Sequence, residues 1–96
     1  MPYITKERRA ILDEYLNKLC RTMREMNELE IKLEKGDLCY CLFKLSKYYI
    51  LTKGMKYQNI SDACASLLDA EYEIRRRILT PYENKKINDN GDIEWK

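Results

Sequence analysis

GDLCYCLFKLSKYYILTKG, residues 36–54, is the stretch of sequence that decides the fold. Asp37 can cap a helix that begins at the next residue, and Gly54 can close that helix in a left-handed conformation. Every residue of 38–43 is apolar or aromatic, so the first turns are hydrophobic around the whole circumference. Such a pattern is typical of a helix surrounded by neighbours. The sequence therefore predicts a central helix over 38–53.

An amphipathic helix precedes this stretch, and Thr5 can cap it. Its apolar positions alternate spacings of four and three residues: Leu12, Leu16, Leu19, Met23 and Met26. Beyond this stripe the period weakens, so we expect the helix over 6–27 and an ending before Gly36.

A third helix is predicted over 60–79, with Asn59 as its cap. Its apolar stripe consists of Ile60, Ala63, Cys64, Leu67, Ile74 and Ile78. Glu71 falls on the same stripe, where a carboxylate is expensive unless a partner holds it. Arg75 follows four residues later, so Glu71 and Arg75 are predicted to form a structural ion pair.

The stretch TPYE, residues 80–83, meets the rules for a helix start. A threonine can cap, a proline occupies the first helical position, and a glutamate can serve as the capping-box acid. We therefore expect a break and a short fourth helix over 81–86. Asn90-Gly91 favours a tight turn, so the tail 87–96 is predicted to form a small hairpin or an ordered tail.

Together these elements predict one all-α domain over residues 1–96, a compact bundle of three main helices plus a short C-terminal helix. Two other helices can hardly cover a central helix that is apolar on every side. We therefore expect a homodimer with that helix near the interface.

Composition narrows the classes of function. With 18 basic and 16 acidic residues the net charge is +2, which gives no reason to expect binding to duplex DNA or to a membrane surface. No apolar run approaches the roughly 18 residues that span a bilayer, and no apolar core follows the first charges. We expect the protein to stay in the compartment where it is made. The cysteines lie within apolar helical patterns, which favours reduced thiols in a cytosol.

Catalytic and metal-binding patterns are missing from the sequence. It contains no histidine, which removes Ser-His and Cys-His pairs and most catalytic zinc sites. Cys39 and Cys41 diverge by roughly 200° on a helix and make a poor chelate. There is no glycine-rich phosphate loop. We expect a binding protein without cofactor or metal, not an enzyme.

The three consecutive arginines at 75–77 allow two interpretations. They fan over roughly 200° of a helix, so at most two can face one ligand. In the first interpretation they end the helix and pair with acids four residues earlier, as Glu71 with Arg75 and Glu73 with Arg77. In the second, at least one binds an anion. Candidate ligand-binding residues for a phosphate-containing molecule with a stacking base are Arg76, Arg77, Tyr82, Lys86 and Tyr40.

Distinctive motifs lie along nearly the whole chain: Pro2-Tyr3-Ile4, Gly36-Asp37-Leu38-Cys39-Tyr40, Glu73-x-Arg75-Arg76-Arg77, Pro81-Tyr82-Glu83-x-x-Lys86 and Asn90-Gly91-Asp92. Together they resemble a family of small uncharacterised proteins from tailed phages and prophages. Cys39 stands where the family pattern has asparagine. The resemblance implies a phage source and the cytoplasm of a bacterial host, but it implies no activity.

Two hypotheses of function follow. The first is a homo-oligomeric sponge that sequesters a nucleotide signal of host immunity, as an anti-defence protein. The second is an interaction module that binds a host or phage protein through an exposed helix face or through the tail with Trp95. A nucleic-acid accessory role is a third hypothesis, which the balanced charge disfavours.

Overall fold

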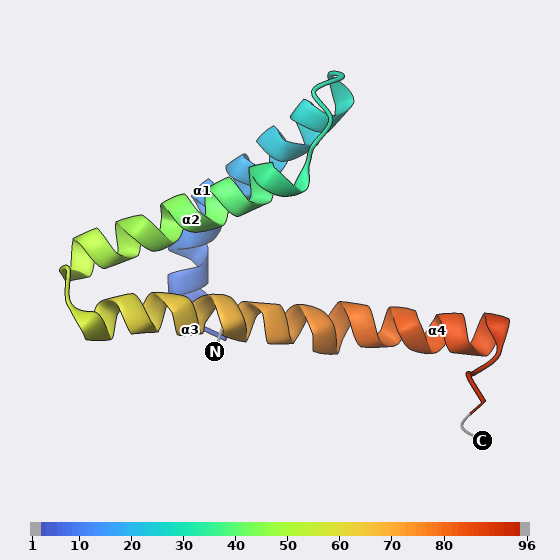
Figure 1. Ribbon diagram of the computed structural model, residues 1–96. Helices are drawn as coiled ribbons and strands as arrows, with labels where there is room; N and C mark the ends of the chain where they lie inside the picture. Colours follow the sequence, from blue (N-terminus) through green and yellow to red (C-terminus); the bar gives the residue numbers. More distant parts are fainter. Residues whose placement is uncertain (1–2, 95–96) are drawn as a thin grey trace.

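The computed structural model describes residues 3–94, and all of its regular structure is helical (Figure 1). This confirms the predicted all-α class. The elements are α1 (Lys6–Glu28), α2 (Lys35–Lys53), α3 (Tyr57–Ile74), a π-helical turn η1 (Arg75–Leu79) and α4 (Thr80–Asn90). None of the helices in the described range is long and apolar enough to cross a membrane.

The first helix begins and ends close to its predicted limits. Thr5 caps it, because its Oγ1 accepts a hydrogen bond from the Arg8 N–H at 3.3 Å. The chain leaves the helix through Leu29, whose N–H donates to the Glu25 carbonyl at 3.0 Å. The local capping signal and the apolar spacing were therefore sufficient to locate α1.

The central helix starts one turn earlier than predicted. Glu34 is its cap residue, and Asp37 occupies the third helical position. The Asp37 Oδ2 reaches back to accept from the Glu34 N–H at 2.9 Å. Asp37 thus stabilises the start of the helix as expected, but it does so from inside the first turn. Gly36 is itself a helical residue.

A short turn joins α2 to α3 and corrects the predicted role of Asn59. The third helix starts at Tyr57, so Asn59 lies inside its first turn and does not cap it. Its Nδ2 instead donates to the Gly54 carbonyl at 2.9 Å. Gly54 ends α2 with a φ of 121° and a ψ of 144°, a region open essentially to glycine alone.

The predicted helix break at residues 80–83 is wrong. Figure 1 shows α3 and α4 as one continuous rod, and Thr80 has helical angles of φ −61° and ψ −48°. The Thr80 N–H donates to the Arg75 carbonyl, five residues back, which widens the turn. A proline in a helix clashes with the carbonyl four residues earlier, and a widened turn moves that carbonyl away. The π-helical turn therefore accommodates Pro81 without ending the helix.

The tail also differs from its prediction. The fourth helix runs to Asn90, and Gly91 ends it with a φ of 86°. No hairpin forms within residues 3–94. Trp95, which the tail hypothesis invokes, lies outside the described residues.

The helices form an open arrangement, in contrast to the predicted compact bundle. α2 and α3 meet at the Gly54 turn and diverge from it, and α1 passes behind α2 in the view of Figure 1. The Cα atoms of α1 stay more than 8 Å from those of every other helix. The radius of gyration is 17.5 Å, against about 13 Å for a compact domain of 100 residues. Ala63 is the only hydrophobic residue in the range 3–94 that is buried.

Candidate functional site

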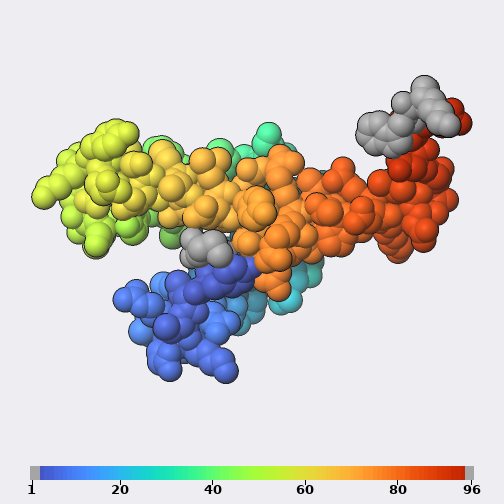
Figure 2. All heavy atoms as spheres, turned by 90° about the horizontal axis from the view of Figure 1, so that it is seen from below, coloured from blue at the N-terminus to red at the C-terminus, as the bar shows by residue number. Residues whose placement is uncertain are grey.

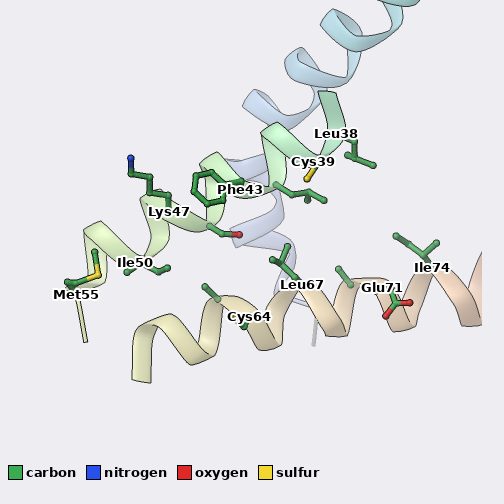
Figure 3. Close-up of a pocket in the computed structure, with 14 residues that line it drawn as sticks. Leu38, Cys39, Phe43, Lys47, Ile50, Met55, Cys64, Leu67, Glu71 and Ile74 are labelled. Atoms are coloured by element: carbon green, nitrogen blue, oxygen red, sulfur yellow. The ribbon is translucent and has the colours of Figure 1, made fainter. Parts of the chain in front are cut away.

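An apolar groove of about 660 Å³ lies between α2 and α3 (Figure 3). It follows both helices where they diverge from the Gly54 turn. Its walls include Leu38, Leu42 and Phe43 from α2 and Leu67, Ala70 and Ile74 from α3. These walls are wide open to solvent: the exposed fraction is 67% for Phe43 and 55% for Ile74.

The spacing of residues on each helix explains why the groove is apolar. On α3, positions 63, 67, 70 and 74 line it, so the spacings are four, three and four, which places them on one helical face. Ala63 and Ala70 are small and leave the hollow between the larger side chains. On α2 residues 38–43 are apolar around the whole circumference, so in these turns whichever face turns toward α3 supplies a hydrophobic wall.

Two charged side chains stand at the rim of the groove, Lys47 on α2 and Glu71 on α3. Figure 3 shows the Lys47 ammonium group pointing away from α3 and the Glu71 carboxylate turned away from α2. The Glu71 Oε1 accepts a hydrogen bond from the Arg75 Nε, which is the ion pair that the i,i+4 spacing predicts. The interior of the groove therefore remains apolar although a glutamate lies on its stripe.

Arg76, the second of the three consecutive arginines, holds the N-terminal segment against the rod formed by α3, η1 and α4. The Arg76 Nη2 donates to the Glu73 Oε2 at 2.9 Å and to the Tyr3 hydroxyl oxygen at 3.0 Å. The Tyr3 hydroxyl in turn donates to the Glu73 Oε2. Figure 2 shows the N-terminal segment lying against the α3–η1 region. We call Tyr3, Glu73 and Arg76 the N-terminal latch.

The latch corrects one predicted pairing. Glu73 was expected to pair with Arg77, but its carboxylate forms an ion pair with Arg76, three residues later. Arg77 forms no ion pair with any residue between 3 and 94. The hydrogen bond from Arg76, followed by that from Tyr3, lowers the pKa of Glu73 below its ordinary value of 4.5. The same contacts raise the pKa of Arg76, with Glu73 as the main cause.

The lowered pKa predicts that acid opens the latch. A carboxyl group whose pKa is lower in the folded state contributes stability above its ordinary pKa and loses that contribution as the pH falls through the lowered value. We therefore expect the ring signals of Tyr3 to stay constant from neutral pH down to 4.5 and to change below it. Tyrosine-labelled NMR, with the Tyr3 signal assigned through Tyr3→Phe, measures this change. Glu73→Gln should abolish the acid transition at Tyr3, and an identical transition in that variant would contradict the assignment.

The structure does not bring the predicted stacking tyrosines together. Tyr40 lies on α2 with the Lys44 Nζ 5.8 Å from its ring centroid. Tyr82 lies on α4 with the Lys86 Nζ 5.6 Å from its ring centroid. The Cα atoms of α2 and α4 stay more than 8 Å apart. Each ring is thus paired with its own lysine, and the hollow that Tyr40 lines includes none of the other four candidate residues.

Sequence reasoning did not identify the groove as a site. The signals were present in the apolar circumference of residues 38–43 and in the alternation of small and large residues on the α3 stripe. What was missing was the angle between the two helices, because the same stripes would make a closed core if α2 and α3 packed side by side along their length.

Comparison with known proteins places the chain in a family. No curated protein and no solved structure matches it. A family model described as a domain of unknown function (DUF6899) matches residues 1–93. Because this match covers nearly the whole sequence, the chain belongs to the DUF6899 family, whose members share a domain of unknown function.

Proposed function

We propose that this protein is a protein-interaction module that takes an amphipathic helix of a partner into the groove between α2 and α3. The observation that carries the proposal is the groove itself, which is lined almost entirely by apolar side chains and is open along two helices. Amphipathic helices dock into such grooves through side chains spaced three, four and seven residues apart.

A protein helix fits this groove better than a small polar ligand does. Sites for small molecules combine apolar walls with a few polar groups that converge on the ligand. Here the two charged groups at the rim, Lys47 and Glu71, point away from the hollow (Figure 3). A partner with apolar side chains and no phosphate therefore suits the chemistry of the walls.

Photo-crosslinking in cells tests the proposal. The photoreactive amino acid p-benzoylphenylalanine replaces Phe43 in the groove or, as a control, Tyr15 on α1. These two aromatic residues are equally open, with exposed fractions of 67% and 68%. We expect a protein adduct from position 43 and none from position 15.

A pair of neighbouring leucines supplies the matched variants. Leu67 lines the groove, whereas Leu68 is on the same helix, is 64% exposed and does not line it. Leu67→Lys should abolish the adduct at position 43, because an ammonium group in an apolar hollow is costly. Leu68→Lys should preserve it. Equal adducts with both variants would refute docking in the groove.

A phage-type nucleotide sponge with an anti-defence role is the second candidate. One observation favours it: Arg77 has no ion-pair partner in the described part of the chain. Fewer residues support it than the sequence suggested. Arg75 and Arg76 form ion pairs with Glu71 and Glu73, and the predicted stacking tyrosines lie on different helices. A thermal-shift screen against cyclic di- and trinucleotides and ADP-ribose decides between the candidates. A true ligand at a hundred times its Kd adds about 2.7 kcal/mol of stability, and this gain would have to vanish in Arg77→Ala.

A further inference from the structure

We infer that the groove is filled by a second copy of this chain, so that two α2–α3 units pack against each other as an obligate homodimer. The inference rests on the proposed function, because it names the partner that docks in the same groove. Three properties of the described surface support it.

The first property is the amount of surface that the single chain leaves open. The accessible area is 9201 Å² for a mass of 11.6 kDa. A compact monomer of that mass would expose about 5,800 Å², so the chain carries an excess of about 3,400 Å². Obligate dimers bury about 2,000 to 5,000 Å² in total over both chains. The excess is sufficient for a permanent interface and far larger than a transient encounter requires.

The second property is the lack of a core. With Ala63 as the only buried hydrophobic residue between 3 and 94, an isolated chain has little apolar burial to offset the entropy lost on folding. Its partner must therefore be present whenever the chain folds. A second copy satisfies this condition, because it is made at the same time and in the same amount.

The third property is an exposed, largely aromatic side of α2 that adjoins the groove. A two-fold interface uses one patch on both chains, so the patch must contain both a hollow and a projection that fits it. The outer side of α2 carries Tyr40, Tyr48 and Leu51, all more than half exposed, which surround a shallow hollow together with Lys44. Phe43 and Lys47 border both this side and the groove. One α2 can thus lie in the groove of the other chain while it offers its own groove in return.

The charge balance permits this self-association. A net charge of +2 produces little repulsion between copies. The groove rim carries one cation and one anion, Lys47 and Glu71, on opposite walls. At the groove itself a second copy therefore meets one charge of each sign, while the outer side of α2 carries Lys44 and Lys47.

Sedimentation equilibrium of the purified full chain tests the inference. We expect a mass of twice 11.6 kDa at micromolar concentration. Leu67→Lys should weaken association by about 100-fold or more, while Leu68→Lys should sediment like the unchanged chain. A single-chain mass for the unchanged protein at every concentration would overturn the inference.

A crosslink locates the interface without relying on a variant that could fail to fold. Chains with and without heavy nitrogen, both carrying p-benzoylphenylalanine at position 43, are mixed, exchanged and irradiated. The dimer we infer gives an adduct of two chains with an intermediate isotopic mass. A double mass without that adduct would place the interface elsewhere and would also overturn the inference.

The same measurements separate this inference from the proposed function. A single-chain mass together with a groove adduct to a different protein would reject the homodimer and keep the interaction module. A single-chain mass without any adduct at position 43 would reject both.

Discussion

Gly54→Ala should lower the free energy of unfolding by about 1 to 3 kcal/mol. Gly54 ends α2 at a φ of 121° and a ψ of 144°, where a side chain is strained. A Cβ at this position would lie 3.8 Å from the Asn59 Nδ2, an ordinary contact. The cost therefore comes from the backbone conformation and not from a clash. The turn sets the angle between α2 and α3, so the substitution should also weaken whatever binds in the groove.

Denaturant unfolding at one fixed protomer concentration measures this effect, because the stability of an associating protein depends on its concentration. Gly36→Ala is the matched control. Gly36 lies in the first turn of α2, and a Cβ at this position would have no other atom within 4 Å. Alanine at this position should therefore raise the free energy of unfolding by about 0.5 to 1 kcal/mol. A loss of stability at both glycines, or at neither, would contradict the assigned role of Gly54.

Pro81→Ala should raise the free energy of unfolding by as much as about 3 kcal/mol, the difference between proline and alanine inside a helix. Pro81 lies within the continuous rod formed by α3, η1 and α4, where it supplies no N–H to the hydrogen-bond ladder. Alanine restores that donor and removes the clash that the π-helical turn relieves. We expect η1 to change to regular α-helix and α4 to rotate about the rod axis.

Thermal unfolding followed by far-UV circular dichroism measures the gain, and hydrogen exchange at η1 reports the change in hydrogen bonding. Thr80→Ala is the control, since it keeps the proline and should gain no more than about 0.7 kcal/mol in helix propensity. If Pro81→Ala were no more stable than Thr80→Ala, contacts of the neighbouring side chains, and not the proline, would be holding the π-helical turn.

Local signals determined the features that the sequence alone predicted correctly. Thr5 caps α1, Gly54 ends α2 with a positive φ, and Glu71 pairs with Arg75. Each of these interactions joins groups within four residues of one another, so helix geometry brings them together wherever the helix lies. The all-α class follows from the same apolar periodicity.

Competition between local signals made other predictions fail. The cap, proline and acid at residues 80–83 favour a new helix, but each such signal is worth only about 1 kcal/mol. The chain instead keeps its helical hydrogen bonds through a π-helical turn. Asn59 likewise has a side chain that often caps helices, yet here its amide group donates a hydrogen bond to the Gly54 carbonyl in the turn. Spacing alone does not rank alternatives of similar energy.

Only the tertiary structure decided how the elements meet. The latch joins Tyr3 to Glu73 and Arg76 across most of the chain, which diverts Glu73 from the partner that its spacing suggested. The groove exists because α2 and α3 diverge from the Gly54 turn, and their stripes are compatible with a closed core as well. The sequence by itself determined which surfaces are apolar, since that depends on residue type and helical period. The angle between the helices determined whether those surfaces cover one another or remain open to a partner.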